Sequence, residues 1–111
     1  MLDGASGYVS VSEQAKSAII GISGSFAFHL QNGFRKAYEG LSEEVELLTL
    51  DLGGVEYMDS SGLGMLLVMK KYLDEVKVNY EITNSRDQTL DLLKMTHFNH
   101  FFKINGEEPI T

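Results

Sequence analysis

The chain has 111 residues, of which 43% are hydrophobic, and its formal net charge is −7. This length suits one domain with a single core, and the composition is that of an ordinary globular protein. The absence of cysteine excludes disulfides and thiolate chemistry, while an acidic chain without a basic cluster argues against binding to nucleic acid or to an anionic membrane surface.

The sequence has no recognisable targeting or membrane segment. Residues 1–7 are polar and lack the basic start and apolar core of a signal peptide. No apolar stretch approaches the roughly 20 residues that span a bilayer. We therefore expect a cytoplasmic domain that does not insert directly into a membrane, and the lack of cysteine fits a reducing compartment.

The first half of the chain predicts two strands and a helix. Apolar residues mark the strands, and residues spaced three and four apart mark the helix, which Gly40 would end as a C-cap. Polar residues between the strands suggest a hairpin-like connection, and residues 23–25 are expected to end the second strand. The expected tail, strands and helix cover residues 1–7, 8–11, 18–22 and 26–39.

The second half predicts two further strands and two helices. The near-continuous apolar run Leu47–Leu50 is typical of a strand buried on both faces. A helix with a wide apolar arc follows Ser61, and residues 76–82 then alternate with the period of a strand. The last helix has potential caps at residues 84–87 and is expected to pack through Leu90, Leu93, Met95 and Phe98.

Alternation of strands with helices predicts crossover connections and a largely parallel sheet. We expect an α/β fold in which a mixed, mostly parallel sheet of four to five strands carries about three to four helices, packed mainly on one face. Residues 101–104 would form the last strand or pack beside the sheet. The domain would cover residues 8–106, between flexible tails at 1–7 and 107–111.

The most informative stretch is the turn that precedes the helix after Ser61. Asp59, Ser60 and Ser61 carry side-chain oxygens that can accept hydrogen bonds from free N–H groups at a helix N-terminus. Gly62 and Gly64 would let a backbone or a partner approach closely. Ser60 and Ser61 are therefore expected to be helix caps, phosphate acceptors or both, because the helix dipole would stabilise a phosphate on a capping hydroxyl.

Other kinds of site fit the sequence less well. A serine-hydrolase elbow needs glycine two residues before the nucleophile, and Met58 stands there relative to Ser60. His97 and His100 could share a metal ion on a helix, but the sequence offers no evident third ligand. The glycines after Ser61 lack the lysine and the spacing of a nucleotide loop. We therefore predict no catalytic residue, no metal and no cofactor.

The chain around this turn resembles the STAS domain family, in particular bacterial anti-sigma factor antagonists. The main match is residues 51–55 (DLGGV) followed by residues 58–64 (MDSSGLG). Residues 24–28 are similar to the family's loop after its second strand, and residues 93–104 to its C-terminal helix and final strand. The resemblance covers residues 8 to about 106.

The resemblance implies a phosphorylation switch and no enzymatic activity. In this family the serine after the aspartate, here Ser60, is phosphorylated by a partner that is both an anti-sigma factor and a serine kinase. The unphosphorylated domain binds that partner and frees the sigma factor, the phosphorylated domain does not bind, and a serine phosphatase resets the switch. The residues expected to contact the partner are Asp59, Ser60, Ser61, Gly62, Leu63 and Gly64.

The chain departs from the family pattern in the loop after the second strand, where Ala27 replaces an acidic residue that is common in the family. Its neighbours Phe26 and Phe28 would instead form an apolar patch that faces the partner. The alternative is an adaptor role, in which the domain docks on a transporter ATPase or a signalling assembly without phosphorylation. Small-ligand binding at the strand ends is a third class, which rests on fold analogy alone.

Overall fold

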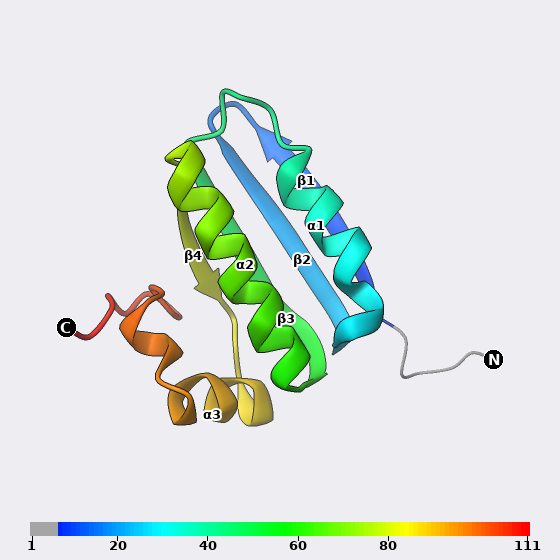
Figure 1. The fold of residues 1–111 in the computed structure, drawn as a ribbon, viewed down its shortest axis with the longest axis vertical. Helices are drawn as coiled ribbons and strands as arrows, with labels where there is room; N and C mark the ends of the chain where they lie inside the picture. Colours follow the sequence, from blue (N-terminus) through cyan, green and yellow to red (C-terminus); the bar gives the residue numbers. More distant parts are fainter. Residues whose placement is uncertain (1–6) are drawn as a thin grey trace.

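The structure is a computed structural model that describes residues 7–111. Residues 1–6 of the predicted N-terminal tail lie outside the described part of the chain. Figure 1 shows how the strands and α-helices are arranged. The described residues form four strands, three α-helices and two short 3₁₀ helices, η1 and η2. In chain order they are β1 (Tyr8–Gln14), β2 (Ser17–Phe26), η1 (Phe28–Leu30), α1 (Gln31–Glu39), β3 (Leu47–Met58), α2 (Ser60–Val76), β4 (Asn79–Thr83), α3 (Asp87–Met95) and η2 (Phe98–His100).

The four strands form one mixed sheet in the order β1-β2-β3-β4. β1 and β2 make an antiparallel hairpin whose turn contains Ala15 with φ of 56°. The pairs β2–β3 and β3–β4 are parallel, because α1 and α2 provide the crossovers between them. The predicted α/β fold with a mostly parallel sheet is confirmed, and the possible fifth strand is reduced to an isolated bridge between Ile82 and Ile104.

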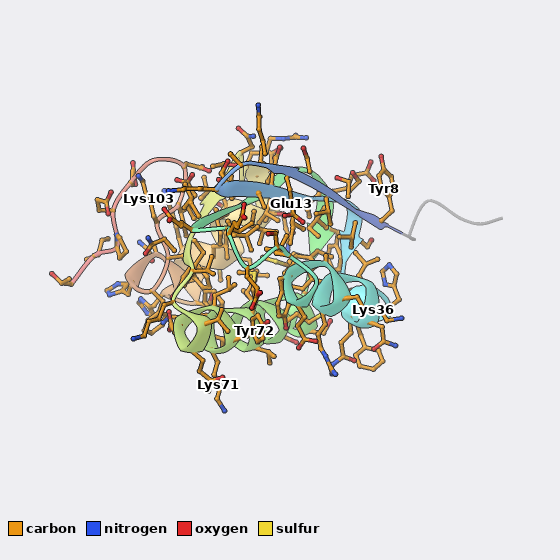
Figure 2. All side chains as sticks on the ribbon, turned by 90° about the horizontal axis from the view of Figure 1, so that it is seen from above. Tyr8, Glu13, Lys36, Lys71, Tyr72 and Lys103 are labelled. Carbon is orange, nitrogen blue, oxygen red and sulfur yellow. The ribbon has the colours of Figure 1, made fainter. Side chains whose placement is uncertain are left out.

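One face of the sheet is covered by α1 and α2, which lie next to each other (Figure 1). In the view from above, Lys71 of α2 points away from the sheet (Figure 2). Leu48 and Leu50 of β3 face these helices and are 0% exposed, whereas Leu47 is 36% exposed. The prediction that Leu47–Leu50 is buried on both faces is therefore wrong, because apolar residues alternate between a covered and an open face.

β2 is longer than the sequence predicts and continues to Phe26, so residues 23–25 do not end it. Phe26 pairs with Met58 at the end of β3, and helical structure begins only at Phe28. The Phe26 side chain is 0% exposed, and its ring packs edge-on against Phe34 of α1 at a centroid distance of 5.1 Å. The predicted start of the helix at residue 26 is therefore wrong, because Phe26 is the last residue of β2 and its side chain is in the core.

The C-terminal part packs beside the carboxyl end of the sheet. Leu93 and Phe98 are buried as predicted, although Phe98 belongs to η2, whereas Met95 is 75% exposed and is no packing residue. The predicted tail from residue 107 makes backbone hydrogen bonds with the domain, since the N–H of Glu107 donates to Ile104 and that of Ile110 to Asn99. The flexibility of this tail stays a prediction.

The first turn of α2 rests against the ends of β2 and β3 through Gly62. A Cβ atom at this position would lie 2.5 Å from the carbonyl oxygen of Phe26 and 2.7 Å from Cγ of Met58. The Phe26 carbonyl is backbone and cannot rotate away. Gly64 differs, because a Cβ atom there would meet nothing within 4 Å. Gly62 thus makes a close approach inside the domain, while Gly64 leaves room on the surface.

We expect Leu48→Ala to lower the free energy of unfolding by about 2–5 kcal/mol, because it opens a cavity under the helices. Leu47→Ala is the matched control on the open face and should cost less than about 1 kcal/mol. Urea denaturation of the two variants tests this. Equal losses of unfolding free energy in the two variants would contradict the conclusion that the helices cover only one face of the sheet.

Replacement of Gly62 or Gly64 of α2 by alanine should change the stability of the domain in opposite directions. Gly62→Ala is expected to destabilise the domain by about 1–3 kcal/mol, because the added methyl group collides with the Phe26 carbonyl. Gly64→Ala should stabilise it by up to about 1 kcal/mol, since alanine is the better helix former and the space is open. Thermal unfolding measures both. A neutral Gly62→Ala variant would refute the close packing at this turn.

Candidate functional site

Asp59 occupies the N-cap position of α2, directly after β3. Its Oδ1 accepts hydrogen bonds from the backbone N–H of Ser61 at 2.9 Å and of Gly62 at 3.3 Å, and from the Ser61 hydroxyl. These bonds satisfy donors that the helix leaves free at its N-terminus. The Ser61 hydroxyl above all, and then the backbone N–H groups, hold the pKa of the Asp59 carboxyl below its usual value, because they stabilise the ionised form.

The two serines of the turn have different surroundings. Ser61 is partly buried, and its hydroxyl is held by Asp59. Ser60 is exposed at the first position of α2, and among the described residues its hydroxyl has no hydrogen-bond partner. Ser61 therefore belongs to the cap, whereas the Ser60 hydroxyl is free to react with or contact another molecule.

The position of Ser60 suits an anion. It stands at the N-terminus of a helix of 17 residues, where the helix dipole produces a partial positive charge. No acidic residue lies in the first turn of α2. The negative charge of Asp59 is already engaged by the N–H groups of Ser61 and Gly62. The dipole of α2 would therefore favour a negatively charged group beside Ser60.

An apolar groove with a volume of about 320 Å³ lies beside this turn, between α1 and α2. Two of its apolar residues are strongly exposed, Phe28 at 68% and Val68 at 58%. We call it the switch groove, and it is lined by Phe28, Gln31, Phe34, Arg35, Tyr38, Ser61, Gly64, Met65 and Val68. Of these residues, Phe28, Ser61 and Gly64 were predicted from the sequence to contact a partner, and the others were not. Their signal is the spacing 31, 34, 35, 38 on α1 and 61, 64, 65, 68 on α2, which indicates two facing helix stripes.

The structure separates the other predicted contact residues by exposure. Ser60 is exposed, whereas Gly62 and Leu63 are buried, with Leu63 8% exposed. Phe26, which was predicted to share an apolar surface patch with Phe28, lies in the core. The patch is corrected to Phe28 and the groove beside it, because Phe26 is the last residue of β2 and faces the helices.

The described residues hold no other obvious chemical centre. His97 and His100 pack ring against ring at 5.3 Å, but residues 7–111 contain no group of three or more metal-ligating side chains. Within the same range, no helix is both long and apolar enough to cross a bilayer. The turn at Asp59–Ser61 and the switch groove remain the main candidate site.

Comparison with known proteins identifies the family. The STAS domain family model matches residues 8–108. A STAS-domain containing protein of Pseudomonas aeruginosa (strain UCBPP-PA14) is 30% identical over 94 residues, which is 85% of this chain and 93% of that protein.

Solved structures of low sequence identity show the same fold. An anti-sigma factor antagonist from Mycobacterium paratuberculosis superposes with a TM-score of 0.80, at 17% identity, over 94% of this chain and 89% of that chain. The anti-sigma factor antagonist SpoIIAA in its unphosphorylated form gives a TM-score of 0.72, at 15% identity, over 86% of each chain. A sulfate transporter family protein from Wolinella succinogenes also shares the fold. Because the family match spans nearly the whole domain, the chain belongs to the STAS domain family.

Proposed function

We propose that this STAS domain is an anti-sigma factor antagonist whose binding is switched by phosphorylation of Ser60. The unphosphorylated domain binds an anti-sigma factor that is also a serine kinase, and the sigma factor is released. Phosphorylation of Ser60 ends the binding, and a serine phosphatase restores it. The observation that carries the proposal is the exposed hydroxyl of Ser60 at the N-terminus of α2, while Ser61 is held by Asp59.

The switch groove supplies a docking surface next to the phosphoacceptor. Phe28 and Val68 are the exposed apolar side chains along it, and Ser61 and Gly64 lie between the groove and the turn. An apolar side chain of the partner that fills the groove would bring the partner's surface over Ser60. Such central apolar contacts contribute most of the binding energy in protein interfaces.

Charge explains how one phosphoryl group reverses the binding. It adds about −1.5 to −2 charges at neutral pH to a domain whose net charge is −7. In an interface that fits a neutral hydroxyl, the new charge must lose its water without gaining a partner. A loss of about 2.7 kcal/mol weakens binding roughly a hundredfold, which is enough for a switch.

Ala27 affects docking of the unphosphorylated domain and release of the phosphorylated domain differently. The residue is half-buried beside the exposed Phe28, so position 27 adds an apolar side chain and no carboxylate to the surface. An apolar surface favours docking of the unphosphorylated form. It also leaves a phosphate on Ser60 without an acidic neighbour at position 27, so the repulsion that opposes binding must arise against the partner.

The fold shared with a sulfate transporter family protein favours one alternative function. In this alternative the domain is an adaptor subunit of a transporter ATPase or a signalling assembly, and it docks without phosphorylation. The same switch groove would then be a constitutive contact. The two functions differ in whether Ser60 must stay unmodified for binding.

The test is to incubate the domain with its cognate kinase and ATP and to locate the modified residue by mass spectrometry. We expect phosphate on Ser60 alone, no phosphorylation of Ser60→Ala, and retained phosphorylation of Ser61→Ala. Ser60→Asp should bind the kinase about a hundredfold more weakly than wild type, because a charge at this position opposes docking. Calorimetry or surface plasmon resonance measures the affinities.

Two variants of α2 separate docking from phosphate acceptance. Val68→Asp places a charge in the switch groove and should weaken binding strongly, whereas Val76→Asp, at a position that is 48% exposed and outside the groove, should not. If a kinase that is active under the same conditions leaves Ser60 unmodified, the proposed phosphorylation switch is refuted. Tight binding of Ser60→Asp to a transporter or signalling complex would establish the adaptor role instead.

A further inference from the structure

Beyond the end of β4, side chains at the start of α3 make hydrogen bonds to the β3 backbone that a longer strand would otherwise make. The pairing of β3 with β4 ends at Asp51 and Thr83, although β3 itself continues to Met58. On this side of β3, Nη2 of Arg86 donates to the carbonyl oxygen of Gly53 at 2.9 Å, and Gln88 bonds to Met58. The backbone of β3 that β4 leaves unpaired is thus held in part by α3.

Gln88 holds Met58 with both halves of its amide. Nε2 of Gln88 donates to the carbonyl oxygen of Met58 at 2.9 Å, and Oε1 accepts from the Met58 N–H at 3.1 Å. One donor and one acceptor for the same residue is the pairing that a neighbouring strand offers. Among side chains only an amide carries both groups in this arrangement, and Asn is one methylene shorter than Gln.

Met58 is the residue directly before the cap of α2. Its side chain is 0% exposed and lies under Gly62, where an added Cβ atom would be 2.7 Å from Cγ of Met58. The side chain of Met58 is therefore fixed by α2 and its peptide groups by α3. The orientation of the Met58 backbone sets the position of the next residue, Asp59. It thereby affects how the Asp59 carboxylate accepts from the N–H groups of Ser61 and Gly62.

We propose that Gln88 is a positioning residue for the Ser60 turn. By holding the peptide groups of Met58, it fixes the orientation in which Asp59 caps α2 and in which Ser60 presents its hydroxyl. α3 is thereby a second point of control over the turn, on the opposite side from the switch groove. The effect of Gln88 on the cap does not depend on the proposed function, whereas its effect on phosphorylation rests on the proposed function of Ser60.

Gln88 can be replaced without damage to the core, because it lies on the exposed side of α3. Gln88→Met keeps the length and the helix propensity of the side chain and removes both hydrogen bonds. Arg86→Met is the matched control, since it removes the hydrogen bond from the N-cap residue of α3 to Gly53 of β3 and leaves Met58 bound. Gln88→Glu is a second variant, which keeps an acceptor for the Met58 N–H but has no donor for its carbonyl.

The first measurement is amide hydrogen exchange followed by NMR. In Gln88→Met we expect the amides of Met58, Ser61 and Gly62 to exchange about tenfold faster, the change expected for loss of hydrogen bonds of ordinary strength. The amides of Leu48 and Leu50 in the sheet centre should keep their wild-type rates, and Arg86→Met should leave the turn unchanged. Gln88→Glu should also exchange faster than wild type at these amides, because a carboxylate oxygen then faces the Met58 carbonyl oxygen.

The second measurement is phosphorylation of Ser60 by the kinase. We expect kcat/KM to fall about tenfold in Gln88→Met, in step with the loosened turn, and to stay unchanged in Arg86→Met. Wild-type exchange at Ser61 and Gly62 in Gln88→Met would overturn the positioning role, and so would equal acceleration at Leu48 and Leu50. Faster exchange at the turn in a protein whose Ser60 is never phosphorylated would keep the positioning role and refute the proposed function.

Discussion

The N-terminus of α2 is the constraint on which the rest of the structure depends. A long helix begins where two parallel strands end, so its free N–H groups need a partner within the domain. Asp59 provides that partner, and Gly62 allows the first turn of the helix to pack closely against the ends of β2 and β3. One carboxylate thus caps α2 directly after β3, at the place where the Ser60 hydroxyl is exposed.

This arrangement gives two adjacent serines different tasks. Modification of the Ser61 hydroxyl would remove its bond to Asp59, whereas the Ser60 hydroxyl makes no such bond. The hydrogen bond to the cap and the exposed hydroxyl therefore belong to different side chains, although the residues are covalent neighbours. A domain with this division can change its surface charge without changing its fold.

The features that depend on local sequence could be predicted, because the signals lie within a few residues. The cap at Asp59 and the alternation of strands and helices belong to this class. The burial of β3 on one face could not be predicted from Leu47–Leu50, since Leu47 is apolar although it is on the open face. Phe26 and Phe28 look alike in sequence, and only the length of β2 decides that one enters the core.

The contact between Gln88 and Met58 had no signal in the sequence. The two residues are 30 positions apart, and an exposed glutamine near a helix start is ordinary in composition. The bond arises because β4 is shorter than β3, which is a property of the assembled sheet. Side-chain groups that replace strand neighbours become visible only when the unpaired backbone of a strand is followed residue by residue.

The bridge between Ile82 and Ile104 has a consequence for how the domain avoids aggregation. β4 is an edge strand, and its outer side is closed by the N–H of Ile82 donating to Lys103 and the N–H of Asn105 donating to Ile82. A strand edge without such cover can pair with the strand of another chain. The C-terminal residues thus protect the sheet from intermolecular strand addition, and they do so at the edge farthest from the β1–β2 hairpin.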